Sequence, residues 1–432
     1  MTTKEASHTE ASTQSVSSAH HVACPFCGLL CDDLEIERKG VALTVTRNGC
    51  ERARAGFERR LPAARPTIEG REVNLNEAVA EAARLIKAAG LPLISGLATD
   101  VEGARAALSL ADRAGAVIDH ALSDAQTRNF RVLQTRGWIT TTLTEARNRA
   151  DLFIIVASDV QSLHPRFIER IVNAPETMFL GAAKRTVVFI GHGLDTSGVN
   201  GTAIGEVLTL ECANERAAEV MSALGARLKG ARIAADAVAG SPLAAIDDLA
   251  GRCRKASYGV VVWAPQALDF ADADLTVHAI ADVVRDLNQT QRFAGLSLGG
   301  NEGAVSAAAV CGWQAGFPLR VSFASGKPDY DPMRFSTSAL LASADADLLV
   351  WVASIGSTLS PPAGKAPMIV IGTPGLEISG QPAVFIPVGT PGIDHAGRMV
   401  RVDNVVSLPL RNLGRSTLLR AADVLAAIEA AL

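Results

Sequence analysis

Helix and strand patterns alternate along the chain from residue 75 onward. Continuous apolar runs such as 152–157 predict strands buried on both faces of a parallel sheet. Residues 76–89 carry apolar side chains at helical spacing, and Gly90 ends the pattern. The alternation predicts βαβ units in mostly parallel sheets, an α/β fold. Further strands are predicted at 91–97, 116–119, 186–191, 259–263, 293–298, 348–352, 368–371 and 384–388.

The number of predicted strands exceeds what one open twisted sheet usually contains, so we expect two sheets. The pattern predicts a first α/β domain at 66–200 and a second at 201–432. The stretch 191–205, rich in Gly, Asn, Ser and Thr, is a candidate link. The boundary is poorly marked, and an interleaved arrangement stays open.

The first 65 residues follow different patterns. Residues 1–21 are rich in Ser, Thr, Ala and His and lack an apolar core, which predicts a disordered tail rather than a secretory signal. Residues 34–37 and 41–45 alternate in polarity around a Lys-Gly pair, a β-hairpin signal. We therefore expect a small cysteine-rich β domain at 22–65.

Four of the seven cysteines fall in this segment, spaced C-x2-C-x3-C-x18-C. Four thiolates so close together suit one tetrahedral centre, either an iron–sulfur cluster or a structural zinc. Empty, paired or free thiols are the alternative, and the sequence leaves both open. The candidate ligands are Cys24, Cys27, Cys31 and Cys50.

Composition narrows the possible partners. The formal net charge is −4 over 432 residues and aromatic residues make up 4%, which disfavours nucleic-acid and membrane-surface binding. The other cysteines, Cys212, Cys253 and Cys311, are isolated, as expected for reduced thiols. No apolar run approaches the ~18 residues of a transmembrane helix, so we expect a cytoplasmic protein.

The chain carries no familiar catalytic motif. It lacks a G-x-S-x-G elbow and a P-loop. Gly299–Gly303 could expose backbone N–H groups to a phosphate, but a tight βα turn explains its glycines as well. Glu302 would also repel an anion there. The histidines are scattered, at His120, His164, His192, His278 and His395.

Residues 24–33, CPFCGLLCDD, resemble the N-terminal cluster motif in the family of the formylmethanofuran dehydrogenase B subunit. That family contains tungsten- or molybdenum-pterin proteins of the formate dehydrogenase superfamily. The resemblance implies a molybdopterin oxidoreductase-like fold, with a small cysteine-rich domain and two Rossmann-like parallel-sheet domains. Further segments agree in order: 148–151, 164–166, 287–301, 313–318 and 385–394.

One departure from the family concerns its redox metal. In the dehydrogenase, a cysteine ligand followed by a histidine sits in the loop after a short strand, here 117–119. The resemblance places those two positions at Ala125 and Gln126. A methyl group cannot ligate a metal, so the redox centre is predicted to be lost, and no tungsten or molybdenum pterin is expected.

Without this redox centre, the chain resembles the B subunit of the bacterial formyltransferase/hydrolase complex of methylotrophs. The resemblance implies a non-catalytic subunit in one-carbon oxidation, where formyl-tetrahydromethanopterin is converted to formate through methylofuran. The implied partners are an amidohydrolase-like hydrolase subunit, a formyltransferase subunit and a third structural subunit.

The alternative is an active pterin-dependent formylmethanofuran or formate dehydrogenase subunit with a different metal ligand. Ser123 and Asp124 lie one or two positions from Ala125 and could supply an oxygen. Metal content would separate the two hypotheses.

Overall fold

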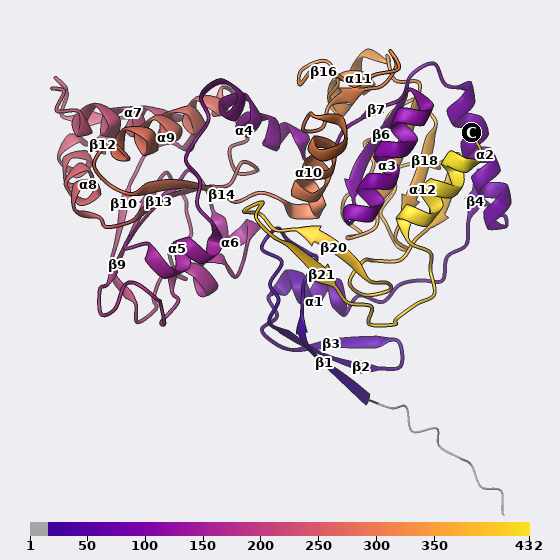
Figure 1. The fold of residues 1–432 in the computed structure, drawn as a ribbon, viewed down its shortest axis with the longest axis horizontal. Helices are drawn as coiled ribbons and strands as arrows, with labels where there is room; N and C mark the ends of the chain where they lie inside the picture. The colour runs from indigo at the N-terminus through magenta and orange to yellow at the C-terminus, as the bar shows by residue number, and fades with distance from the viewer. Residues whose placement is uncertain (1–15) are drawn as a thin grey trace, which may run out of the picture.

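Two mainly parallel β-sheets covered by helices make up most of the structure, a computed structural model that describes residues 16–432 (Figure 1). The smaller sheet has five strands in the order β10-β9-β8-β13-β14, all parallel. Every residue of β8 and β13 is buried, as their apolar runs predict. The strands are β8 (Leu152–Val156), β9 (Arg185–Ile190), β10 (Ile204–Leu210), β13 (Gly259–Trp263) and β14 (Phe293–Ser297).

The larger sheet has nine strands in the order β16-β15-β7-β6-β17-β18-β19-β4-β5. Its five central strands, from β7 to β19, are parallel, and short antiparallel strands close both edges. The strands are β4 (Thr67–Ile68), β5 (Arg71–Glu72), β6 (Pro92–Ala98), β7 (Val117–Ile118), β15 (Val321–Ser322), β16 (Asp329–Tyr330), β17 (Leu348–Ala353), β18 (Met368–Gly372) and β19 (Val384–Pro387).

Amphipathic helices bury their apolar stripes against the sheets. Asn74 forms a capping box with Glu77 at the start of α2, and Asp100 caps α3. Helices of the nine-stranded sheet are α2 (Leu75–Ala88), α3 (Val101–Ala114), α10 (Ala304–Ala315), α11 (Thr337–Ser343) and α12 (Ala421–Ala430). Those of the five-stranded sheet are α4 (Ser123–Arg136), α5 (Leu143–Arg149), α6 (Val160–Leu163), α7 (Ala217–Leu228), α8 (Leu243–Lys255) and α9 (Ala273–Leu287).

Short elements complete the described chain. A π-helical turn, η1, follows α6, and two 3-10 turns, η2 and η3, precede α7 and α10. Two small antiparallel pairs lie outside the main sheets. These elements are η1 (Ile168–Val172), η2 (Asn214–Arg216), η3 (Asn301–Gly303), β11 (Ala237–Val238), β12 (Ser241–Pro242), β20 (Gly397–Val400) and β21 (Ser407–Leu410).

The two sheets are interleaved along the chain, an arrangement that the sequence left open. The nine-stranded sheet takes its strands from 67–118 and 321–387, whereas the five-stranded sheet uses 152–297. The boundary predicted near residue 200 is wrong, because β9 and β10, on either side of it, pair directly. Apolar runs identify strands but do not say which of them pair, so the composition of the loop 191–205 is no guide to a domain link.

The N-terminal segment forms the predicted hairpin within a three-stranded antiparallel sheet. Strands β2 (Leu34–Lys39) and β3 (Ala42–Arg47) make the hairpin, and β1 (Val16–Val22) pairs with β2. The tail prediction is therefore wrong for residues 16–21, where hydrogen bonding to β2 orders a polar segment. Its remainder, 1–15, lies outside the described residues.

The cysteine-rich segment does not have a core of its own. Helix α1 (Glu51–Phe57) follows Cys50, and the ring of Phe57 meets that of Phe26 edge-on at 5.1 Å between centroids. The buried residues of this segment belong to one hydrophobic cluster with those of α5, the five-stranded sheet and the β20–β21 hairpin. The segment is thus packed into the larger body rather than forming the separate small domain expected at 22–65.

Candidate functional site

The cysteine loop is a tight turn pressed against the loop that follows β14. Cys24 N–H donates to Cys31 O at 2.8 Å, and Leu30 N–H donates to Cys27 O at 3.1 Å. Gly28 is required at the point of contact, since a Cβ there would lie 2.2 Å from Gly299 O. The cysteines are therefore held directly beside the glycine-rich loop.

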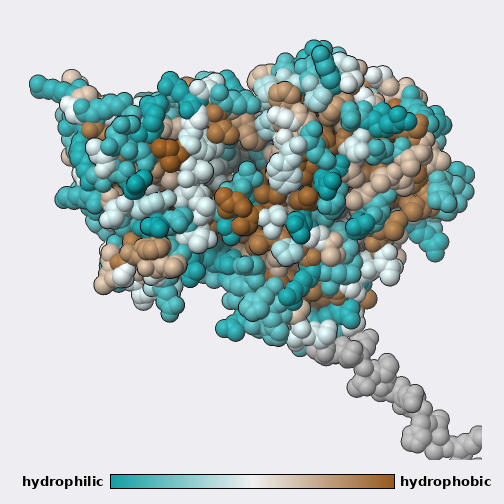
Figure 2. Space-filling view, viewed as in Figure 1, coloured by the Kyte–Doolittle hydropathy of each residue, from teal (hydrophilic) through white to brown (hydrophobic). Residues whose placement is uncertain are grey.

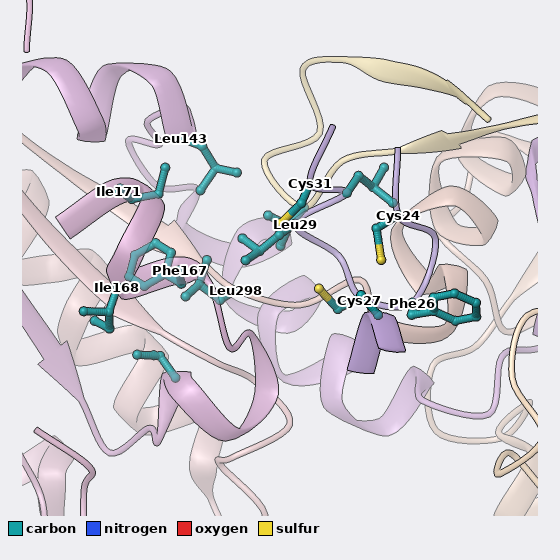
Figure 3. Close-up of a cluster of buried hydrophobic side chains, with 14 of the residues drawn as sticks. Cys24, Phe26, Cys27, Leu29, Cys31, Leu143, Phe167, Ile168, Ile171 and Leu298 are labelled. Atoms are coloured by element: carbon teal, nitrogen blue, oxygen red, sulfur yellow. The ribbon is translucent and has the colours of Figure 1, made fainter. Parts of the chain in front are cut away.

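The four N-terminal cysteines line one narrow cavity of about 10 Å³, and Figure 3 shows three of them around the loop. Cys24, Cys27 and Cys31 are buried, while Cys50 is partly exposed. Within residues 16–432, however, no three His, Cys, Asp or Glu side chains converge as a metal-binding group. The structure thus brings the predicted ligands together without setting their sulfurs as a ligand shell.

Burial favours the protonated form of the Cys24 and Cys27 thiols. It raises the pKa of Cys27 to about 12, and the nearby Cys31 adds to the effect. Burial and then Cys27 raise the pKa of Cys24 well above its ordinary value. Metal binding would need thiolates, so a metal would have to displace these protons.

Two arginines flank the cysteine loop on the side of η1. Arg166 makes a bidentate pair with Asp33, at 2.7 and 2.8 Å, and a second pair with Glu169. Burial raises the pKa of Cys31, while the adjacent Arg170 acts in the opposite direction. A cation beside this sulfur would favour its thiolate form and is compatible with an anionic centre.

The glycine-rich loop Gly299–Gly303 is clamped by two buried histidines from different parts of the fold. His120, after β7, uses Nε2 to donate to Glu302 O at 3.1 Å, because its Nδ1 accepts from Leu122 N–H. His164, after α6, uses Nε2 to donate to Gly299 O at 3.0 Å. Burial lowers the pKa of both histidines to about 4, so both are neutral.

Glu302 occupies the centre of this loop in a left-handed conformation, with φ +53. Its side chain is buried, and Oε2 has no hydrogen-bond partner. Burial raises the pKa of Glu302, whereas Arg52 and Arg59 act in the opposite direction. An ionised carboxyl group on this loop would disfavour a bound phosphate through like-charge repulsion.

The position that the family resemblance assigns to the metal-binding cysteine, Ala125, lies in the first turn of α4. Ala125 and Gln126 are both buried there. Arg320 donates to Ser123 Oγ from Nε at 3.1 Å and from Nη2 at 3.0 Å, and it also pairs with Asp124. Both oxygen groups considered as replacement metal ligands are therefore engaged by one arginine.

Sequence reasoning missed this arginine. Arg320 immediately precedes β15, which pairs antiparallel with β7 in the register Val321 with Ile118. That pairing brings the guanidinium within 3.7 Å of Asp119. A single arginine next to a short strand has no local pattern, and only the long-range pairing places it at the site.

A cleft of about 550 Å³ opens next to Gln126, between α4 and α10. Most of its walls are apolar, including Leu133, Trp138 and Trp313. The carboxyl end of β14 forms its floor with Ser297, as is common for ligand sites in open α/β sheets.

No helix within residues 16–432 is long and apolar enough to span a membrane.

The relatives found by comparison with known proteins are B subunits of two kinds of enzyme complex. No protein-family model matches the chain. The B subunit of the tungsten-containing formylmethanofuran dehydrogenase 2 of Methanocaldococcus jannaschii is 28% identical over 410 residues, covering 90% of this chain and 92% of that protein. The Fhc B subunit of the formyltransferase/hydrolase complex of Methylorubrum extorquens is 29% identical over 335 residues, covering 72% and 86%.

The fold agrees with a solved structure of the second relative's complex. A chain in the crystal structure of FhcABCD from Methylorubrum extorquens, in complex with methylofuran, superposes with a TM-score of 0.71. The two are 27% identical, and the match covers 84% of this chain and 98% of the other. The predicted resemblance to the formylmethanofuran dehydrogenase B subunit, and the α/β fold with parallel sheets, are confirmed.

Proposed function

We propose that this chain is the non-catalytic B subunit of a formyltransferase/hydrolase complex, with a formate dehydrogenase-like fold whose redox centre is lost. The observation that carries the proposal is the engagement of Ser123 and Asp124 by Arg320 beside Ala125. The first turn of α4 has no cysteine, and both oxygen groups considered as replacement metal ligands contact this arginine.

The complex would convert the formyl group of formyl-tetrahydromethanopterin to formate by way of methylofuran. The chemistry would reside in a formyltransferase subunit and an amidohydrolase-like hydrolase subunit, and this chain would hold them together with a third structural subunit in the cytoplasm. Its 48% hydrophobic composition supports a large subunit interface, because obligate interfaces resemble a core cut in half.

The alternative, an active tungsten- or molybdenum-pterin subunit, has relatives of similar identity in its favour. Names alone therefore do not decide between the two. A pterin metal here would need Asp124 or Ser123 to leave Arg320. That exchange would remove one contact of the buried Arg320 guanidinium, which would keep its pair with Asp119 at 3.7 Å.

For the four cysteines we propose one metal centre, a [4Fe–4S] cluster or zinc, that acts as a clip for the N-terminal segment. Their shared cavity and the cation Arg170 support a centre. The absence of a ligand shell among the described residues means that the side chains would have to turn inward on loading. When bound, the centre would cross-link the cysteine loop, residues 24–31, to the segment around Cys50.

The test is a reconstitution with the partner subunits. We expect the chain to be poorly soluble alone and to assemble when co-expressed with them. The complex carrying Asp124→Ala should release formate at a rate within about twofold of the unmodified complex, as should the control Asp274→Ala, whose carboxylate pairs with Arg131. A loss on the order of a hundredfold in dye-coupled oxidation for Asp124→Ala alone, with the complex intact, would establish the redox function instead.

A further inference from the structure

The cleft between α4 and α10 has the size and lining of a small-molecule site. Its volume of about 550 Å³ falls within the ~300–1,000 Å³ typical of ligand pockets. Figure 2 shows apolar side chains at the surface between the two sheets, near the middle of that face. Aromatic rings at the cleft come from Phe130 and Trp138 and, on α10, from Trp313. The other α10 residues that line the cleft are the smaller Val305, Ala308, Ala309 and Gly312.

One polar group in the cleft is unsatisfied. Gln126 is 7% exposed, and its Oε1 is buried without a hydrogen-bond partner. Its neighbour Asn129 is different, since it donates to Ser297 Oγ at 2.7 Å and accepts from Trp263 Nε1 at 2.9 Å. A buried acceptor without a donor is costly, and a ligand that donates one hydrogen bond would remove that cost.

The charges around the cleft exclude an anionic ligand. Among the described residues that line it there is no Lys, Arg or His. The one ionisable lining residue, Asp403, is paired with Arg401 at 2.7 Å. Nothing in the lining would neutralise a phosphate, so the pyrophosphate of a pterin dinucleotide does not fit this cleft.

We propose that this cleft binds a neutral, planar aromatic molecule that donates a hydrogen bond to Gln126 Oε1. The rings of Trp138 and Trp313 supply apolar contact, and the small α10 residues Ala308, Ala309 and Gly312 leave room for a ring. The lost metal-ligand region would thus serve a different class of ligand. This inference is independent of the proposed subunit role, because it concerns a binding site and not the assembly.

The first test uses indole as the probe and 1-methylindole as its matched control. Indole has the N–H donor, whereas the methyl group removes it and leaves the ring. In calorimetric titrations of the full chain we expect indole to bind with a dissociation constant of about 1 mM or lower, at least several-fold tighter than 1-methylindole. Gln126→Leu should abolish that preference while retaining binding of 1-methylindole.

The second test locates the site. Gly312 has open space where a Cβ would lie, so Gly312→Leu should fold and fill the cleft. Gly251, in α8, has the same open surroundings, and Gly251→Leu is its control. We expect Gly312→Leu to block indole and Gly251→Leu to leave it unchanged. Failure of indole to bind, an unchanged preference in Gln126→Leu, or normal binding to Gly312→Leu would overturn the proposal.

Discussion

Arg320 and Ser123 meet at the first turn of α4, beside Ala125, with the guanidinium Nε 3.1 Å from the hydroxyl oxygen. The contact joins the start of β15 to the start of α4. Together with Asp119 and Asp124, Arg320 forms an ion-pair network at this turn. This network, the histidine clamp and the cysteine loop each have measurable consequences.

Replacing Arg320 should be among the most destabilising single changes in α4 and its surroundings. Arg320→Met would leave Asp119 buried without a counter-charge, at a cost of about 3–5 kcal/mol in the free energy of unfolding. Arg131→Met removes a partly exposed pair between α4 and Asp274 of α9 and should cost less than about 1 kcal/mol. Denaturant unfolding of both variants measures these costs. Equal losses of unfolding free energy in the two variants would contradict a central role for Arg320.

Restoring the family's cysteine should not restore a metal. Ala125→Cys adds one sulfur to a buried position whose next residue is Gln126 and whose neighbouring oxygens are bound to Arg320. We expect unchanged assembly and no gain of tungsten or molybdenum after expression with both metals supplied. Stoichiometric metal in this variant would show that the rest of a pterin site is intact.

The histidine clamp predicts a specific loss of stability in acid. The pKa of His120 is about 4 in the folded chain and about 6.5 when unfolded, so below pH 6.5 only the unfolded state takes up the proton. Stability should therefore fall between pH 6.5 and pH 4 by up to about 3 kcal/mol for this group, and not further below pH 4. His164 should behave in the same way.

The check is unfolding free energy against pH for His120→Gln, compared with His192→Gln. His192 is exposed, and its replacement serves as the surface control. His120→Gln should be less stable at pH 7 but should lose less stability between pH 6.5 and pH 4 than the unmodified chain. Parallel profiles for all three proteins would rule out the clamp as the source of acid sensitivity.

The cysteine site makes a compositional prediction. Anaerobically purified protein should contain iron with sulfide, or zinc, at about one centre per chain. Cys27→Ser should remove it, whereas Cys253→Ser, a buried cysteine in α8, should not. If the intact protein contains none of the three elements, the four residues are only buried thiols.

The parts of the fold that depend on local pattern could be predicted, and those that depend on distant pairing could not. Apolar runs located β8 and β13, and the Lys-Gly turn located the β2–β3 hairpin. The interleaving of the sheets and the contact of Arg320 with Ser123 both depend on partners about 200 residues apart, for which the sequence has no periodic signal.

The candidate site likewise has one part that the sequence predicted and one part that it did not. The spacing of the cysteines predicted that they lie together, and they do line one cavity. The clamp on Gly299–Gly303 was not predicted, because His120 and His164 are single residues in unrelated segments that only the tertiary fold brings to one loop.

The central claim is that this chain has no redox metal, and metal content tests it most directly. The assembled complex, purified from cells supplied with tungsten and molybdenum, should be analysed for both elements together with pterin. We predict neither element in stoichiometric amount while formate release is intact. Tungsten or molybdenum at about one atom per chain, released together with a pterin and reducing a dye with substrate, would contradict it.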